Sequence, residues 1–139
     1  MRSKQQLLEL IEKTEPDRSR YLKGLFEYVP DRVVEELIYE KVQKGKYILR
    51  AGTPSDMVYM ILSGKIMGVD HQRMGRVYYF MDFTKMYVIG DFEIFAEFPE
   101  YCVSICAAKD CMLLKLPAAS YMNWIKHDEN ALFLRMKNI

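Results

Sequence analysis

Hydrophobic and polar residues follow two different periods, and the change of period divides the chain into three parts. Before residue 39, apolar side chains recur every three or four positions, which is typical of helices with one buried face. Short apolar runs separated by turns with glycine or proline then follow, which is typical of antiparallel strands. After Pro117 the helical spacing returns. The pattern predicts helices in 1–38, a β-domain in 39–117 and helices in 118–139.

Three helices are expected before the β-domain, in residues 3–13, 18–28 and 30–38. Ser3 and Gln6 form a capping box for the first helix, and Pro16 suits the first turn of the second. The third helix carries one apolar face, which is made of Val33, Val34, Leu37 and Ile38. The simplest interpretation is that these helices cover a core and have no other role.

Two further helices are expected at the C-terminal end, in residues 118–126 and 129–139. In the second of these, Leu132, Met136 and Ile139 follow the i, i+4, i+7 spacing of a helix seam. We therefore expect these three residues to form the seam of a homodimer. Neither a capping residue nor a glycine closes this helix, so we expect a helix that is cut short at residue 139.

Eight short strands are expected in residues 40–43, 46–50, 57–62, 65–69, 77–83, 87–89, 101–107 and 111–116. Strands this short with turns this frequent indicate a sandwich or barrel rather than a parallel sheet. The fold class that fits is mainly β: a double-stranded β-helix jelly roll with flanking α-helices.

Composition narrows the class further. The chain has 139 residues with a net charge of +1, so neither a nucleic-acid surface nor a membrane surface is indicated by charge. Its three cysteines, Cys102, Cys106 and Cys111, do not resemble a disulfide framework, which predicts a reducing, cytoplasmic location. No apolar run reaches the roughly 20 residues of a membrane span, and charges near the N-terminus exclude a signal-peptide core.

A family resemblance lies in residues 42–64, where the pattern Lys-Gly-x6-Gly-x5-Val-Tyr-x2-Leu-Ser-Gly occurs. The pattern is set by Gly45, Gly52, Gly64, Val58 and Tyr59. It resembles the first half of the cyclic-nucleotide-binding domain, the effector-sensing jelly roll of Crp/Fnr transcription regulators, cyclic-nucleotide-gated channels and protein kinase regulatory subunits. The resemblance extends over roughly residues 26–139 and is more specific for the fold than for the ligand.

Residues 88–102 correspond in position and length to the phosphate-binding cassette of that family. The resemblance implies a helix N-terminus and an arginine for the cyclic phosphate, and a glutamate for the ribose hydroxyl. Gly90 and Pro99 match the cassette, whereas Asp91 replaces the glutamate. Glu100 stands at the position of the arginine, and Cys102 stands where a small hydroxyl residue is common.

The cassette is therefore acidic where the family needs a cation. No lysine or arginine occurs from residue 86 to residue 108, although four acids do. We predict that the domain does not bind cyclic nucleotides at micromolar concentration, because a phosphate would meet carboxylates in a pocket of low dielectric constant. The candidate ligand-binding residues, carried over from the cassette, are Gly90, Asp91, Phe92, Glu93, Pro99, Glu100, Tyr101 and Cys102.

Two interpretations of the pocket remain open. It holds a different small molecule, apolar or cationic in view of the acids, or it is filled by the protein's own side chains. The side chains that could fill it are Phe92, Phe95, Phe98, Tyr101, Tyr79 and Met81.

Catalytic and metal-dependent functions find little support. Two histidines, His71 and His127, cannot supply the three that a metal-binding cupin enzyme of the same fold uses. His71 could ligate haem, but it lies in the tip of a polar hairpin, so we expect a solvated loop residue. The cysteines lack a Cys-x2-Cys pair, and the acids lack the spacing of a calcium loop. We expect no enzyme activity, no catalytic residue, no metal and no cofactor.

The resemblance implies the effector-sensing domain of a Crp/Fnr-type transcription regulator. In that family the helix after the roll pairs two subunits, and a helix-turn-helix module, absent from these 139 residues, binds DNA. An unidentified effector would reposition the cassette and the C-terminal helix. The alternative is a stand-alone module of the same fold that binds a small molecule or a protein and has no role with DNA. No membrane partner is expected.

Overall fold

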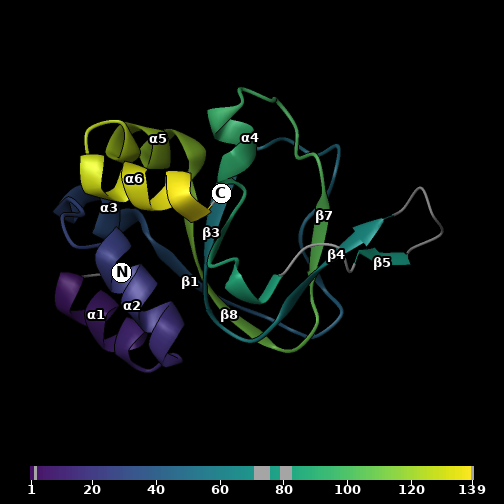
Figure 1. The fold of residues 1–139 in the computed structure, drawn as a ribbon, viewed down its shortest axis with the longest axis horizontal. Coiled ribbons are helices and arrows are strands. Elements are labelled where there is room, and N and C mark those ends of the chain that lie inside the picture. The colour runs from purple at the N-terminus through teal and green to yellow at the C-terminus, as the bar shows by residue number, and fades with distance from the viewer. Residues whose placement is uncertain (2, 71–75, 79–82, 139) are drawn as a thin grey trace.

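The computed structural model describes residues 1, 3–70, 76–78 and 83–138. Two antiparallel sheets face each other, and a layer of helices covers the outer side of one of them (Figure 1). The predicted jelly roll with flanking helices is confirmed. A short helix, α4 (Asp91–Phe95), lies beside α5 at one end of the two sheets.

The first sheet has the strand order β1-β8-β3-β6. Its strands are β1 (Ile38–Val42), β3 (Met57–Ser63), β6 (Val88–Ile89) and β8 (Cys111–Pro117). Central strand β8 pairs with β1 in the register Glu40↔Leu113 and with β3 in the register Met60↔Leu114. The two long central pairings fix which face of β3 and β8 meets the helices, because alternate residues of a strand point to opposite faces.

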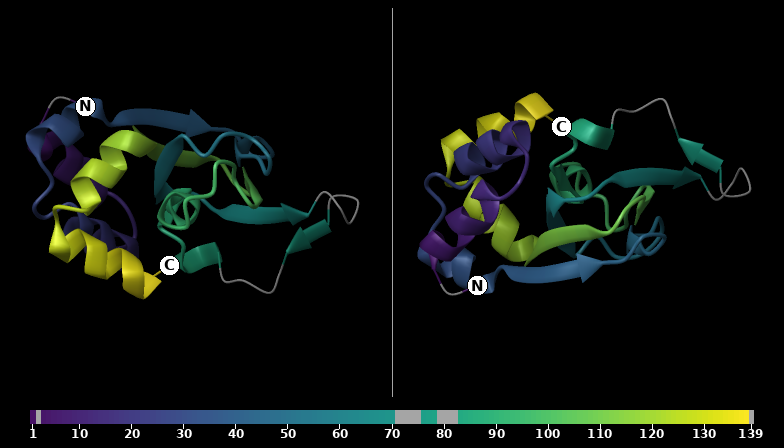
Figure 2. Two further views of the ribbon diagram at one scale, coloured as in Figure 1. Left: turned by 90° about the horizontal axis from the view of Figure 1, so that it is seen from above. Right: turned by 90° about the horizontal axis from the view of Figure 1, so that it is seen from below.

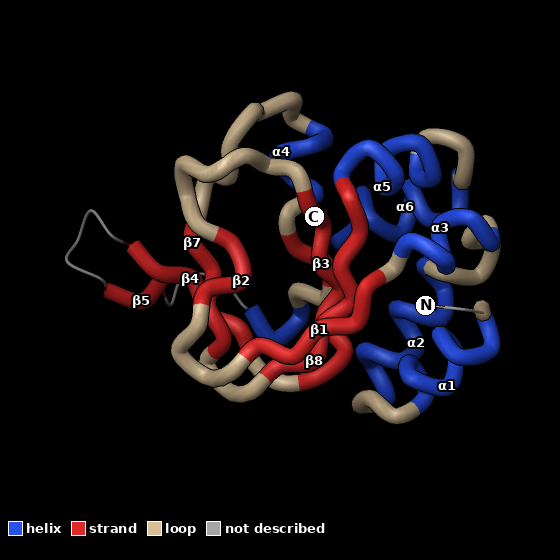
Figure 3. The backbone as a smooth tube through the Cα atoms, turned by 180° about the vertical axis from the view of Figure 1, so that it is seen from behind, coloured by secondary structure: helices blue, strands red, loops and turns tan. Residues whose placement is uncertain are grey.

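The second sheet has the strand order β2-β7-β4-β5. Its strands are β2 (Tyr47–Leu49), β4 (Ile66–Asp70), β5 (Arg76–Tyr78) and β7 (Ser104–Ala107). The tube view from behind shows the two groups of strands opposite each other, with β4 and β5 leading away from the helices (Figure 3).

The helical layer combines both ends of the chain (Figure 2). It consists of α1 (Lys4–Glu12), α2 (Pro16–Leu25), α3 (Asp31–Glu36), α5 (Ala118–Ile125) and α6 (Glu129–Asn138). The predicted caps are confirmed: the Ser3 Oγ accepts a hydrogen bond from the Gln6 N–H at 3.2 Å, and Pro16 is the first residue of α2.

Two separate apolar clusters hold these layers together. The helix-side core lies between the helices and the first sheet and includes Phe26, Met60, Leu114, Tyr121 and Trp124, all at most 1% exposed. The roll interior lies between the two sheets and includes Ile48, Ile61, Ile89, Ile105 and Leu113.

Some boundaries differ from the sequence predictions. Ile38, expected on the buried face of the third helix, begins β1 and is 49% exposed. Residues 101–103 precede β7 instead of opening it, because Tyr101 is tied to the neighbouring loop by its backbone: its N–H donates to Thr53 O, and its carbonyl accepts from Gly52 N–H. Of the expected strand 77–83, Phe83 belongs to a 3-10 helix, Phe83–Lys85, and residues 79–82 lie outside the described residues.

Candidate functional site

Helix α4 begins directly after β6, and a glycine makes this sharp transition possible. Gly90 adopts a left-handed conformation with φ of 91°, and a Cβ atom there would lie 2.8 Å from the Met57 carbonyl oxygen. A side chain at this position would therefore strain the backbone and collide with β3. The glycine that the sequence assigned to the cassette thus sets the position of the next three residues, Asp91, Phe92 and Glu93.

Asp91 is fully buried and makes an ion pair with Arg135 of α6. The Arg135 Nε and Nη2 atoms lie 2.6 and 2.9 Å from the two carboxylate oxygens of Asp91. Tyr121 of α5 donates a third hydrogen bond to Asp91 at 2.5 Å, and the Arg135 Nη1 atom donates to the Tyr21 hydroxyl of α2 at 2.9 Å. Two hydrogen bonds in a planar fork hold both charges in one geometry, so the pair joins the cassette to α6 directly.

The same network shifts the acid–base properties of its members. Burial raises the pKa of Tyr121 well above its ordinary value, and the negative charge of Asp91 raises it further. Burial would lower the pKa of Arg135, but the hydrogen bonds and charge of Asp91, with smaller contributions from Tyr121 and Tyr21, outweigh that effect and raise it. Arg135 is therefore a permanent cation whose charge is already neutralised by Asp91.

Glu93 is the second buried acid of the cassette, at 3% exposure. Its Oε2 atom accepts a hydrogen bond from the Cys102 N–H at 2.9 Å, which ties α4 to the segment before β7. Desolvation and the charge of Glu93 both raise the pKa of the Cys102 thiol. The Glu93 carboxylate thus holds one wall of the cassette in place and makes its surroundings electronegative.

The remaining predicted cassette residues bind the neighbouring loop. The carbonyl of Pro99 accepts from the Ser55 N–H at 3.0 Å, and exposed Glu100 forms an isolated β-bridge with Pro54. The Tyr101 hydroxyl donates to the Met57 carbonyl at 2.6 Å and accepts from the Met57 N–H at 3.1 Å. Burial is the main reason why the pKa of Tyr101 rises to about 12.

A cavity of about 340 Å³ lies beside α4, between the cassette and the end of α6. Five of the eight predicted residues line it, namely Gly90, Asp91, Phe92, Glu93 and Cys102. Pro99, Glu100 and Tyr101 do not, so the acids that face the cavity are Asp91 and Glu93 rather than Glu100. The other described residues of its lining are Met86, Val88, Ile89, Val103, Ile105, Arg135 and Asn138.

The sequence analysis missed Arg135 and Asn138 as site residues. Arg135 is a charged residue next to Met136 of the predicted dimer seam, yet its side chain is 2% exposed. A useful signal was present: residues 131 and 135 are four apart, so Arg135 shares the inward face of the helix with buried Ala131. Nothing in the sequence pairs this arginine with Asp91, which lies 44 positions earlier.

The side chains that could have filled the pocket take different positions. Phe95 packs against the helix-side core, and the Tyr101 hydroxyl is held by Met57. Phe92 and Phe98 are 51% and 44% exposed and meet edge to face, with ring centroids 5.9 Å apart. Tyr79 and Met81 lie outside the described residues.

Metal and haem ligation gain no support from the described residues, among which no group of three histidine, cysteine or acidic side chains could hold a metal ion. Cys106 and Cys111 are buried and Cys102 is exposed, and all three are free thiols. His127 is exposed at the end of α5, while His71 lies outside the part of the chain that is described. None of the described helices is long and apolar enough to span a bilayer.

Together, the two-sheet roll, the glycine-led helix α4 and the cavity beside it define a jelly roll with a cavity at one end. Comparison with known families identifies it: residues 39–128 match the model of the cyclic nucleotide-binding domain. The chain belongs to this family, whose members are typically non-catalytic regulatory modules. No curated protein matches the sequence.

Solved structures share the fold at low sequence identity. The sensor domain of the transcriptional regulator DNR from Pseudomonas aeruginosa is 17% identical with a TM-score of 0.63, over 96% of this chain and 88% of that one. A regulatory subunit of a cAMP-independent protein kinase A from Trypanosoma brucei is 19% identical with a TM-score of 0.62, over 96% of this chain and 50% of that one. A putative cyclic nucleotide-binding protein from Geobacter metallireducens is 11% identical with a TM-score of 0.60, over 99% and 92%.

Proposed function

We propose that this chain is the effector-sensing domain of a Crp/Fnr-type transcription regulator, and that its effector is not a cyclic nucleotide. The fold is that of a regulatory module, and the likeness to the DNR sensor domain extends over nearly the whole chain. DNA binding would belong to a helix-turn-helix module outside these residues, because no recognition helix with a basic face is found among the described helices.

The observation that carries this proposal is the ion pair between Asp91 and Arg135. Asp91 lines the cavity, and Arg135 is fixed in α6, so a ligand that moves α4 also changes the contacts of α6. A buried pair of this kind tolerates little change in geometry, because separating the charges leaves each one uncompensated. Effector binding would thereby shift the population of α6 positions, which is the form of signal that a regulator needs.

The same pair supports the exclusion of cyclic nucleotides. Arg135 is the sole cation among the described lining residues, and Asp91 occupies its guanidinium fork. A cyclic phosphate would therefore enter a site with no free cation and a second carboxylate, Glu93. The cost of desolvating an unpaired phosphate exceeds what hydrogen bonds from a short helix could return.

We further propose that α6 pairs two copies of the protein. Met136 is 60% exposed and neighbouring Phe133 is 58% exposed. Of the other residues of the predicted seam, Leu132 is partly buried against the helix-side core and Ile139 lies outside the described residues. The contact surface would thus centre on Met136 and Phe133. Sedimentation velocity is expected to show a dimer that Met136→Glu dissociates, while Asn123→Glu at an exposed position of α5 does not.

A second candidate function is a free-standing module that binds a small molecule or a protein. It is supported by the Geobacter metallireducens protein, of which this chain covers 92%. Dimerisation through α6 with a ligand-dependent shift of that helix favours the regulator. A monomer whose α6 is unaffected by ligand favours the free-standing module.

Calorimetric titration with cyclic AMP and cyclic GMP tests the proposal about the ligand. We expect no one-to-one binding at micromolar concentration for either nucleotide. The variant Glu100→Arg restores the arginine of the family pattern, but position 100 is exposed and outside the cavity lining, so we expect no gain in affinity. Micromolar binding to the unmodified protein would contradict the proposal.

A further inference from the structure

The cavity beside α4 is the site of the proposed function, and its lining indicates which class of molecule it takes. Five of its described lining residues are apolar and lie in strands β6 and β7 or just before them: Met86, Val88, Ile89, Val103 and Ile105. A space of about 340 Å³ is large compared with the roughly 30 Å³ that one water molecule occupies in the liquid. An apolar body the size of one or two fused rings would gain by leaving water for such a wall.

The charges of the lining select against anions. Its three charged residues are Asp91, Glu93 and Arg135, which sum to −1 at neutral pH. The charge of Arg135 is matched by Asp91, so the excess negative charge belongs to Glu93. An anionic ligand would be repelled by this charge, and a neutral ligand would leave it uncompensated.

Glu93 is also incompletely bonded for a buried acid. Its Oε2 atom accepts from Cys102, whereas its Oε1 atom makes no hydrogen bond to any described residue. This oxygen is not fully enclosed by the protein: the residue is 3% exposed and lines the cavity, so the remaining accessibility of Oε1 is towards that space. Buried carboxylates are ordinarily paired or fully hydrogen-bonded, and the spare oxygen of Glu93 is therefore a place for a donor from a ligand.

An aromatic side chain adds a second attraction for a cation. Phe92 lines the cavity yet is 51% exposed, and its ring meets Phe98 edge to face. A positive charge near an aromatic face is stabilised by the electrons of the ring. Phe92 and Glu93 both line the cavity, so both attractions act on a ligand inside it.

We propose that the cavity binds a small organic monocation, an amine with an apolar body, whose ammonium group pairs with Glu93 beside the ring of Phe92. This inference rests on the proposed function, since it names the ligand class of the same site. The apolar walls hold the body of the ligand, and Glu93 selects its charge. Loss of the ligand would leave the carboxylate of Glu93 with its hydrogen bond from Cys102 but without a charged partner.

Three probes with one ring system and different charges test this selection. Tryptamine is cationic, indole is neutral and indole-3-acetate is anionic at neutral pH. Calorimetry or ligand-observed NMR on the whole chain is expected to rank their affinities in that order. In Glu93→Gln, where the amide oxygen can still accept from Cys102, the affinity for tryptamine falls at least tenfold and the affinity for indole does not.

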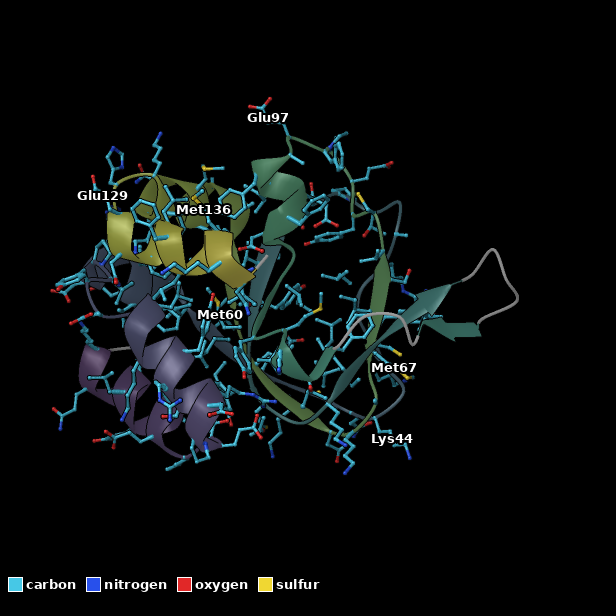
Figure 4. All side chains as sticks on the ribbon, in the orientation of Figure 1. Lys44, Met60, Met67, Glu97, Glu129 and Met136 are labelled. Carbon is cyan, nitrogen blue, oxygen red and sulfur yellow. The ribbon has the colours of Figure 1, made fainter. Side chains whose placement is uncertain are left out.

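Glu97→Gln is the matched control, because Glu97 is an exposed acid just after α4 that projects away from the cavity (Figure 4). We expect it to bind tryptamine as the unmodified protein does. Retained indole binding by Glu93→Gln shows that this variant keeps its fold. Equal or tighter binding of indole-3-acetate, an unchanged affinity for tryptamine in Glu93→Gln, or no binding of any probe would each overturn the inference.

These results are separate from those that test the proposed function. The exclusion of cyclic nucleotides fails if either nucleotide binds, and the regulator proposal fails if α6 does not respond to changes at Asp91. A protein that rejects tryptamine but still couples Asp91 to α6 would refute only the ligand class.

Discussion

The two sides of the first sheet are built from the same strands but pack against different layers, helices on one side and the second sheet on the other. Along β3, Val58, Met60 and Leu62 face the helix-side core, whereas Ile61 faces the roll interior. On the helix side, Trp124 stacks on Phe26 with ring centroids 5.4 Å apart. On the interior side, the wall that contains Ile105 borders a cavity of about 340 Å³.

The difference separates stability from ligand binding. Burial of large side chains against five helices makes the helix side the main source of stability, because dense packing maximises both hydrophobic and dispersion contributions. The roll interior retains unfilled space at the cassette end, which a ligand can occupy. Asp91 and Arg135 both line that space. Asp91 accepts a hydrogen bond from Tyr121 of the helix-side core, and its ion-pair partner Arg135 belongs to α6. The ion pair is therefore the link between the two sides.

The largest expected effect comes from breaking this link. Arg135→Met leaves Asp91 buried without a cation, so we expect a loss of about 3–5 kcal/mol in the free energy of unfolding, measured by urea denaturation. Adding Asp91→Asn to that variant removes the uncompensated charge and is expected to recover part of the loss. Equal stability of Arg135→Met and the unmodified protein would show that the pair does not join the two sides.

Truncating one buried side chain on each side of the first sheet compares how much the two sides contribute to the free energy of unfolding. Leu114 is 0% exposed in the helix-side core, and Leu114→Ala is expected to cost about 2–5 kcal/mol because it leaves a cavity among buried side chains. Ile105 borders existing space, so Ile105→Ala is expected to cost less, about 1–2 kcal/mol. Equal losses in urea denaturation would mean that both sides are packed to the same degree.

Features of the fold that depend on one residue or its near neighbours could be predicted from the sequence, whereas contacts between distant residues could not. Ser3 and Pro16 were located correctly because caps and first turns depend on single residues. Gly90 was assigned by its match to the family cassette, and its positive φ was not predicted. Ile38 was misplaced because one apolar residue at a boundary fits a helix face and a strand equally well. Arg135 was missed because an ion pair over 44 positions leaves no periodic signal in either segment.

The cassette itself shows the same limit. The family resemblance placed Pro99, Glu100 and Tyr101 among the candidate ligand-binding residues. In the structure they contact the loop that contains Pro54 and Ser55 and do not line the cavity beside α4. The left-handed backbone at Glu97, with φ of 59°, belongs to this departure of the chain from α4. A match in length alone therefore cannot say which side chains face the cavity.

A smaller effect is expected from Tyr101 in the roll interior, whose contribution to stability depends on pH. The pKa of Tyr101 is raised to about 12, mainly by burial, so the folded state favours the protonated phenol. Its contribution to stability is complete below pH 10, the ordinary pKa of tyrosine, and is lost as the pH rises towards 12. We expect Tyr101→Phe to be less stable than the unmodified protein at pH 8, with a difference that narrows above pH 10. A constant difference in urea denaturation across this range would contradict the assignment.

Hydrogen exchange of the α6 amides in Asp91→Asn tests the central claim most directly, since the claim is that the cassette holds α6 through Asp91 and Arg135. The substitution keeps the shape of the side chain and removes its charge. We expect faster exchange in residues 129–138, with α1 and α3 unchanged, and no effect of the control substitution Glu97→Gln. Exchange in α6 that is the same in Asp91→Asn and the unmodified protein would contradict the account.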